Sequence, residues 1–94
     1  MKKTIWKFAF EINDEIVIEM PKGAKILTVQ VQNGLAFIWA LVDPDAEKEK
    51  RYFDLYGTGH PIDMSIDRWY VGTFQIAGGD LVFHLLGRIN SDEI

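Results

Sequence analysis

Hydrophobic and polar side chains alternate along most of this chain, which is the pattern of β-strands that bury one face. The first such segment places apolar residues at alternate positions, Trp6, Phe8, Phe10 and Ile12. The same period of two recurs over residues 16–20, 27–32, 51–56, 69–76 and 80–86. Residues 35–42 are apolar at both sets of positions, which predicts a central strand covered on each side. The chain therefore contains seven or eight predicted strands.

Residues that favour turns separate these segments. Asn33-Gly34 is the strongest signal, because a type I′ turn requires positive φ at both central residues. The mixed charges of residues 45–50 predict a solvated loop, and residues 60–68 follow no regular period. Short strands at such spacing are typical of an all-β fold. We expect a compact antiparallel β-sandwich or small barrel over residues 1–87, followed by a polar C-terminal tail over 88–94; the pattern leaves sandwich and barrel open.

The alternation also predicts which side chains share a face. The predicted apolar sets are Leu27, Val29 and Val31 in one segment, and Tyr70, Phe74 and Ile76 in another. In residues 51–56, Phe53 and Leu55 occupy one face. We therefore expect Tyr52, Asp54 and Tyr56 to point outward and to be available to a ligand.

Composition narrows the classes of function. The chain has 94 residues, no cysteine and a formal net charge of −4. The lack of cysteine excludes disulfides, thiolate chemistry and Cys-ligated metals. The acidic balance argues against direct nucleic-acid binding, because phosphate contacts require a basic face. We expect no cofactor.

Two further signals concern the cellular location. Lys2 and Lys3 are not followed by the apolar segment of a signal peptide. The longest apolar run, residues 35–42, is about a third of the length that a membrane helix requires. We therefore expect a cytoplasmic protein with no membrane partner.

The string Gly57-Thr58-Gly59-His60 is the most unusual local motif. Glycines allow a backbone to approach a ligand closely and can expose N–H groups to an anion. The string lacks the lysine and helix start of a phosphate loop, so a simple strand-ending turn stays an alternative. Aromatic residues could add stacking to bases, and the candidates are Trp39, Tyr52, Tyr56, Trp69 and Tyr70. We select Tyr52, Tyr56 and Trp69 for the ligand site; core packing or a subunit interface is the alternative for all five.

Catalytic signals are weak. His60 and His84 are the two histidines, and neither stands in a metal-binding or nucleophile motif. A small metal-dependent hydrolase that uses these histidines and nearby aspartates is a hypothesis that we rank below the binding functions described below. We assign no catalytic residue and no metal ligand.

Several strings of the chain, over about residues 2–86, resemble a family of small proteins that bacteriophages and prophages encode and that carry a domain of unknown function. These strings include Lys3-Thr4-Ile5-Trp6-Lys7-Phe8, Ile18-Glu19-Met20-Pro21-Lys22-Gly23-Ala24, Val29-Gln30-Val31-Gln32-Asn33-Gly34, Trp39-Ala40-Leu41-Val42-Asp43-Pro44 and Gly57-Thr58-Gly59-His60-Pro61-Ile62, together with Gly72-Thr73-Phe74-Gln75 and Leu81-Val82-Phe83-His84. The tail after Leu86 lies outside this pattern. The resemblance implies a phage accessory protein and transfers no functional residue.

From these observations we expect a non-enzymatic binding protein that antagonises a host defence system. In one hypothesis an oligomeric pocket sequesters a small nucleotide signal. In the other the protein is an interaction module, which inhibits a host nuclease or defence protein or serves as a small virion or assembly component. Several strands are apolar on two sides, and 94 residues cannot cover both faces of a sheet thoroughly. Either two sheets pack on each other, or a face or edge is buried against another copy, and we expect a homo-oligomer.

Overall fold

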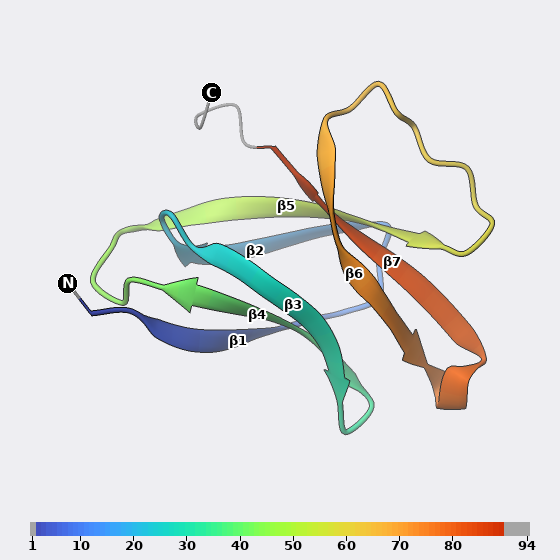
Figure 1. Cartoon of the computed structure of the whole chain (residues 1–94), viewed down its shortest axis with the longest axis horizontal. Helices are drawn as coiled ribbons and strands as arrows, with labels where there is room; N and C mark the ends of the chain where they lie inside the picture. The colour runs from blue at the N-terminus through green and yellow to red at the C-terminus, as the bar shows by residue number, and fades with distance from the viewer. Residues whose placement is uncertain (1, 90–94) are drawn as a thin grey trace.

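The computed structural model describes residues 2–89 and contains seven strands in two antiparallel sheets. The strands are β1 (Thr4–Phe10), β2 (Glu15–Pro21), β3 (Lys25–Gln32), β4 (Leu35–Val42), β5 (Lys48–Gly57), β6 (Arg68–Ile76) and β7 (Leu81–Arg88), with a short 3-10 turn, η1 (Ala77–Gly79), before β7. One sheet has the order β1-β4-β3 and the other β2-β5-β7-β6 (Figure 1). The predicted all-β fold is confirmed, and its architecture is sandwich-like.

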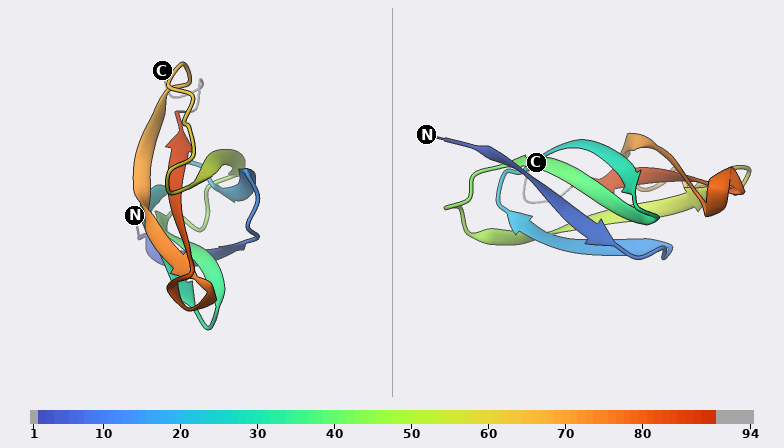
Figure 2. Two further views of the ribbon diagram at one scale, coloured as in Figure 1. Left: turned by 90° about the vertical axis from the view of Figure 1, so that its right-hand side faces the viewer. Right: turned by 90° about the horizontal axis from the view of Figure 1, so that it is seen from below.

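The two sheets stack as layers, with β6 and β7 extending past the three-stranded sheet at one end (Figures 1 and 2). Their facing sides form one core, in which Met20, Ile38, Phe53 and Leu85 are essentially inaccessible to solvent. Phe10 and Phe74 meet across this core edge to face, with ring centroids 5.9 Å apart. The alternation seen in the sequence therefore supplies the buried faces of both layers.

The Asn33-Gly34 turn joins β3 to β4 as predicted, with φ values of 53° and 78°. β4 is the central strand of its sheet. Its second face is not covered, however, since Leu35 remains 60% exposed and Phe37, Trp39 and Leu41 are half-buried. The prediction of a strand covered on both sides was wrong for the face that carries Leu35, because the four-stranded sheet packs only against the opposite face of β4.

Two β-bulges change the predicted faces. The pairing of β3 with β4 shifts between Ile26 and Thr28, which leaves Leu27 44% exposed and turns Ile26 toward the core instead. The pairing of β6 with β7 shifts between Tyr70 and Gly72, so Tyr70 is 56% exposed while Phe74 is buried. An extra residue reverses the alternation beyond it, which a strict period of two does not anticipate.

The predicted strand boundaries need two changes. β5 begins at Lys48, inside the predicted loop, because residues 48–50 pair with residues 19–21 of β2. β7 continues through Arg88, one residue beyond the predicted end of the domain, and most of the predicted tail (residues 90–94) lies outside the described residues. Over residues 2–89, no helix has the length and apolarity needed to cross a membrane.

Candidate binding face

The outer face of the four-stranded sheet gathers most of the polar chemistry. On β5 the pleat turns Phe53 and Leu55 into the core and places Tyr52, Asp54 and Tyr56 on the opposite side. Neighbouring strands add side chains that contact this side. We call the resulting surface the tyrosine face, and it consists of Tyr52, Asp54, Tyr56, Arg68, Tyr70, His84 and Arg88.

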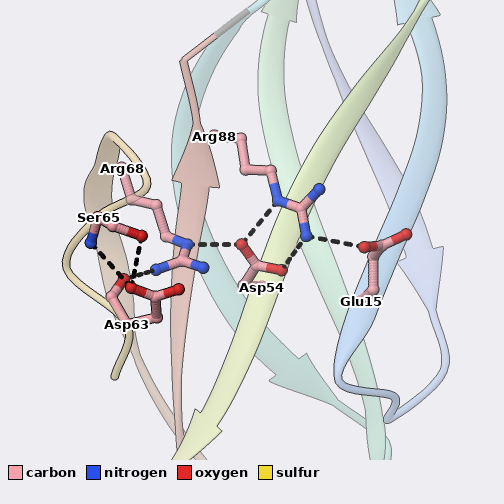
Figure 3. Close-up of polar contacts among 6 residues, drawn as sticks. All are labelled: Glu15, Asp54, Asp63, Ser65, Arg68 and Arg88. Atoms are coloured by element: carbon pink, nitrogen blue, oxygen red, sulfur yellow. Dashed lines mark hydrogen bonds and ion pairs between the residues drawn. The ribbon is translucent and has the colours of Figure 1, made fainter. Parts of the chain in front are cut away.

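Asp54 is the centre of this face, and it is only 5% exposed. Its carboxylate accepts a hydrogen bond from Arg68 Nε at 2.6 Å and two from Arg88, from Nε at 2.8 Å and Nη2 at 2.6 Å. Arg88 Nη2 also donates to Glu15 at 2.7 Å, and Arg68 Nη1 donates to the backbone oxygen of Asp63 at 2.6 Å. Asp54 lies on the outer side of β5 as predicted, but the prediction that it is available was wrong, because two guanidinium groups cover it (Figure 3).

The electrostatics of the network follow from this geometry. Hydrogen bonds from Arg88, followed by those from Arg68, hold the pKa of Asp54 below its ordinary value of 3.8 despite its burial. The same contacts raise the pKa of Arg88 further above its ordinary value. Ser65 lowers the pKa of Asp63 by donating from its hydroxyl and its backbone N–H. The network therefore stays ionised at neutral pH and fixes both arginines on the sheet.

A second cluster surrounds His84 on β7. Its Nε2 is hydrogen-bonded to the Thr58 hydroxyl at 2.7 Å, and its Nδ1 to the Tyr70 hydroxyl at 2.7 Å. The Tyr70 hydroxyl also contacts the Thr73 hydroxyl. The imidazole thus ties the end of β5 to β6 and holds Tyr70 in place on the face.

The predicted loop residues lie beside this face but are engaged with one another. The His60 ring packs against Gly57, where a Cβ would come within 3.0 Å of it. The Thr58 N–H donates to the Val82 carbonyl, and Gly59 has a φ of 88°. The close approach that glycine permits at position 57 is thus made by a side chain of the same loop.

The aromatic candidates separate into two groups. Tyr56 lies on the tyrosine face, where the Arg68 guanidinium sits 5.5 Å from its ring centre, and Tyr52 shares this face. Trp69 lies on the inner side, since its ring covers the buried Gly87 so closely that a Cβ there would come within 2.6 Å. Trp69 and the two tyrosines therefore cannot stack on one ligand.

An open hollow of about 550 Å³ connects the loop to the network. Tyr56, His60, Pro61, Arg68 and Arg88 line it, together with Leu55 and the acidic residues Asp14, Glu15, Asp54 and Asp63. Four carboxylates thus face two guanidinium groups, which leaves the hollow with a negative balance. No group of three or more histidine, aspartate or glutamate side chains in residues 2–89 is arranged to hold a metal ion.

Arg68 and Arg88 were not selected from the sequence, whereas Tyr70 was named only as a stacking aromatic and His84 only in the hydrolase hypothesis. The one available signal was Asp54, a charged residue between two apolar residues in a strand. Its partners follow 14 and 34 positions later, and only the pairing of β5 and β6 with β7 brings them together.

Comparison with known proteins places the chain in a family. Residues 1–93 match the model of a domain of unknown function, DUF7352. The chain belongs to this family. The match extends to residue 93, past Leu86, where the resemblance seen in the sequence ended. No curated protein and no solved structure is significantly similar to the chain.

Proposed function

We propose that this DUF7352 protein is a non-enzymatic binding protein whose tyrosine face contacts a protein partner. The observation that carries the proposal is the Asp54 network, which fixes the partly exposed Arg88 and the buried Arg68 side chain on the same sheet face as three tyrosines. Tyrosine and arginine are the residue types enriched where truncation costs most binding energy. Fixing them before binding lowers the entropy that association must overcome.

The shape of the surface also supports a protein partner. The hollow at the tyrosine face is open to solvent, whereas small-molecule sites enclose most of the ligand. Tyr52 and Tyr70 are 41% and 56% exposed, and Val17, which is paired with Tyr52, is 48% exposed. These side chains offer apolar contact area beside the arginine network, and tyrosine and arginine are both enriched at protein interfaces.

A small nucleotide is the second candidate ligand. Tyr56 and His60, both selected from the sequence, line the same hollow as Arg68 and Arg88. A base could stack on Tyr56, but a phosphate would have to compete with four carboxylates for two guanidinium groups. We therefore rank a nucleotide below a protein partner.

The biological setting is proposed from the sequence resemblance alone. The similarity to phage and prophage proteins suggests a phage accessory protein that acts in the host cytoplasm. Its partner would then be a host defence protein such as a nuclease, and the first alternative is a component of the virion or its assembly.

Site-specific photocrosslinking tests the proposed face. Benzoylphenylalanine replaces Tyr52 or Tyr70 in host cells, and Leu35, which is 60% exposed on the other sheet, provides the matched control. We expect one discrete adduct from positions 52 and 70 that position 35 does not give. The captured protein is then purified and titrated calorimetrically against the wild type and the Tyr52→Ser and Tyr70→Ser variants, with an expected loss of about tenfold or more in affinity for each variant.

Two results would overturn this proposal. Equal adducts at all three positions, or unchanged affinity of both variants, would remove the tyrosine face from the interface. Saturable binding of a labelled nucleotide that His60→Ala and Tyr56→Ala abolish would instead favour the second candidate.

A further inference from the structure

The four border strands of the two sheets are not equally protected against pairing with another chain. β3 and β6 lie beside each other, with Val29 Cγ1 3.0 Å from the Cβ position of Gly72, and each carries a bulge. β2 ends in Pro21, which has no backbone N–H and so cannot donate a hydrogen bond to an added strand. β1 pairs with β4 without interruption over residues 4–10 and contains neither a proline nor a bulge. The free edge of β1 is therefore the least protected one (Figure 1).

The one charged side chain of β1 does not guard this edge. Lysine on an edge strand usually discourages pairing. The Lys7 ammonium instead donates to Gln32 of β3 at 2.8 Å and lies 4.7 Å from the ring centre of Phe37 on β4. Its side chain thus extends across β4, away from the free edge.

Apolar side chains are exposed on both faces of β1. Ile5 on the outer face is 56% exposed. Trp6 is 37% exposed although it pairs with Ala40, which is fully buried. A strand added beside β1 would continue both faces and cover these side chains.

The charges that flank β1 match those of a second copy. Lys3 and Glu11 stand one residue before and one residue after the strand, both are exposed, and neither has a hydrogen bond or ion pair within residues 2–89. If two β1 strands pair antiparallel about a two-fold axis at Lys7, Lys3 of each copy lies opposite Glu11 of the other. The same register places Trp6 opposite Phe8, and Ile5 opposite Ala9. It also places the two Lys7 residues opposite each other, but the ammonium of each extends across its own β4 to Gln32 and Phe37, away from the shared edge.

The neighbouring symmetric registers lack this match. An axis at Trp6 places Lys3 opposite Ala9, and an axis at Phe8 places Lys3 opposite Asn13. We therefore propose that the protein forms a homodimer through antiparallel pairing of two β1 strands about Lys7, which joins the two three-stranded sheets into one six-stranded sheet. This interface lies on the sheet opposite the tyrosine face, and it does not depend on the function proposed above.

Charge reversal tests the partner and the register together. Sedimentation velocity at rising concentration should show a wild-type dimer. Lys3→Glu and Glu11→Lys should each raise the dimer dissociation constant roughly tenfold, because each creates two like-charge contacts. The combined Lys3→Glu/Glu11→Lys variant restores both pairs and should return to within about threefold of the wild type. Lys22→Glu, in the exposed turn between β2 and β3, controls for net charge.

A cysteine scan gives an independent measure of the axis. The chain has no cysteine, so a single introduced cysteine can form a disulfide only with the same position of a second chain. Directly opposed residues of antiparallel strands lie within the Cα separation that a disulfide spans. Lys7→Cys should therefore link two chains under mild oxidation, whereas Ala9→Cys, which faces Ile5 of the other copy, should not.

Three outcomes would overturn the homodimer. These are a wild type that stays monomeric up to millimolar concentration, a dimer that tolerates both single reversals, and linkage of Ala9→Cys as efficient as that of Lys7→Cys. Crosslinking at Tyr52 or Tyr70 is not affected by these variants, so a failure of the dimer and a failure of the proposed function are separable.

Discussion

Replacing Asp54 with asparagine should destabilise the fold far more than a surface substitution does. The change keeps the shape of the side chain and removes its charge, so two guanidinium groups lose a shared carboxylate at 2.6–2.8 Å. Arg68 has only 6% of its side chain exposed and cannot regain water easily. Removing one partner of such a buried pair typically costs about 3–5 kcal/mol.

Part of this cost is recovered at Arg88. Its side chain is 30% exposed, and it keeps the bond to Glu15. We therefore expect a loss of about 2–4 kcal/mol in the free energy of unfolding, against a total of about 5–15 kcal/mol for a domain. A loss of this size lowers the melting temperature by about 10–25 °C for a chain of this length. Urea unfolding followed by tryptophan fluorescence measures it.

The dependence on pH identifies the cause. Because the folded-state pKa of Asp54 is lower than its ordinary value of 3.8, its ionisation stabilises the fold fully above pH 3.8. This contribution is lost as the pH falls below 3.8 toward the lowered pKa. The stability difference between the wild type and Asp54→Asn should therefore be constant at neutral pH and shrink in acid.

Asp80→Asn is the matched control, because Asp80 is exposed in the turn before β7. A loss below about 1 kcal/mol for Asp54→Asn, or a loss equal to that of Asp80→Asn, would refute the reasoning. A difference that does not change with pH would show that packing, and not charge, causes the loss.

Three further predictions concern packing and turns. Gly87→Ala should cost about 1–3 kcal/mol in urea unfolding, because its Cβ would come within 2.6 Å of the Trp69 ring, and adding Trp69→Leu should recover part of this loss. Gly34→Val should cost about 1–2 kcal/mol, since a φ of 78° is strained for a β-branched residue; an unchanged denaturation midpoint would contradict the hairpin turn. His84→Ala removes the bonds to Thr58 and Tyr70 and should cost about 1 kcal/mol, with faster amide exchange at Thr58 as the local readout.

The buried faces of the strands could be predicted where the pleat is regular. Ile16, Ile18 and Met20 alternate in the sequence and are all buried in β2. The prediction failed at Leu27 and Tyr70, where bulges shift the register. A bulge depends on how two strands pair, so the local period of either strand does not reveal it.

The candidate face was only partly visible in the sequence. Tyr52 and Tyr56 were selected because the alternation of β5 turns them away from Phe53 and Leu55, and the structure places them on the tyrosine face. Trp69 was selected with them, although its ring covers Gly87 on the inner side. Composition suggested an aromatic surface, but the side of the sheet that each ring occupies depends on the register of β6 with β7.

The sequence by itself determined the all-β class, most of the strands and the Asn33-Gly34 turn, because these depend on the conformational preferences and periodicity of neighbouring residues. Only the tertiary structure decided that Asp54 is covered by Arg68 and Arg88 and that β1 keeps a free edge. Both features depend on which strands become neighbours. Strand order joins residues that are far apart in the chain, and local sequence does not encode those contacts directly.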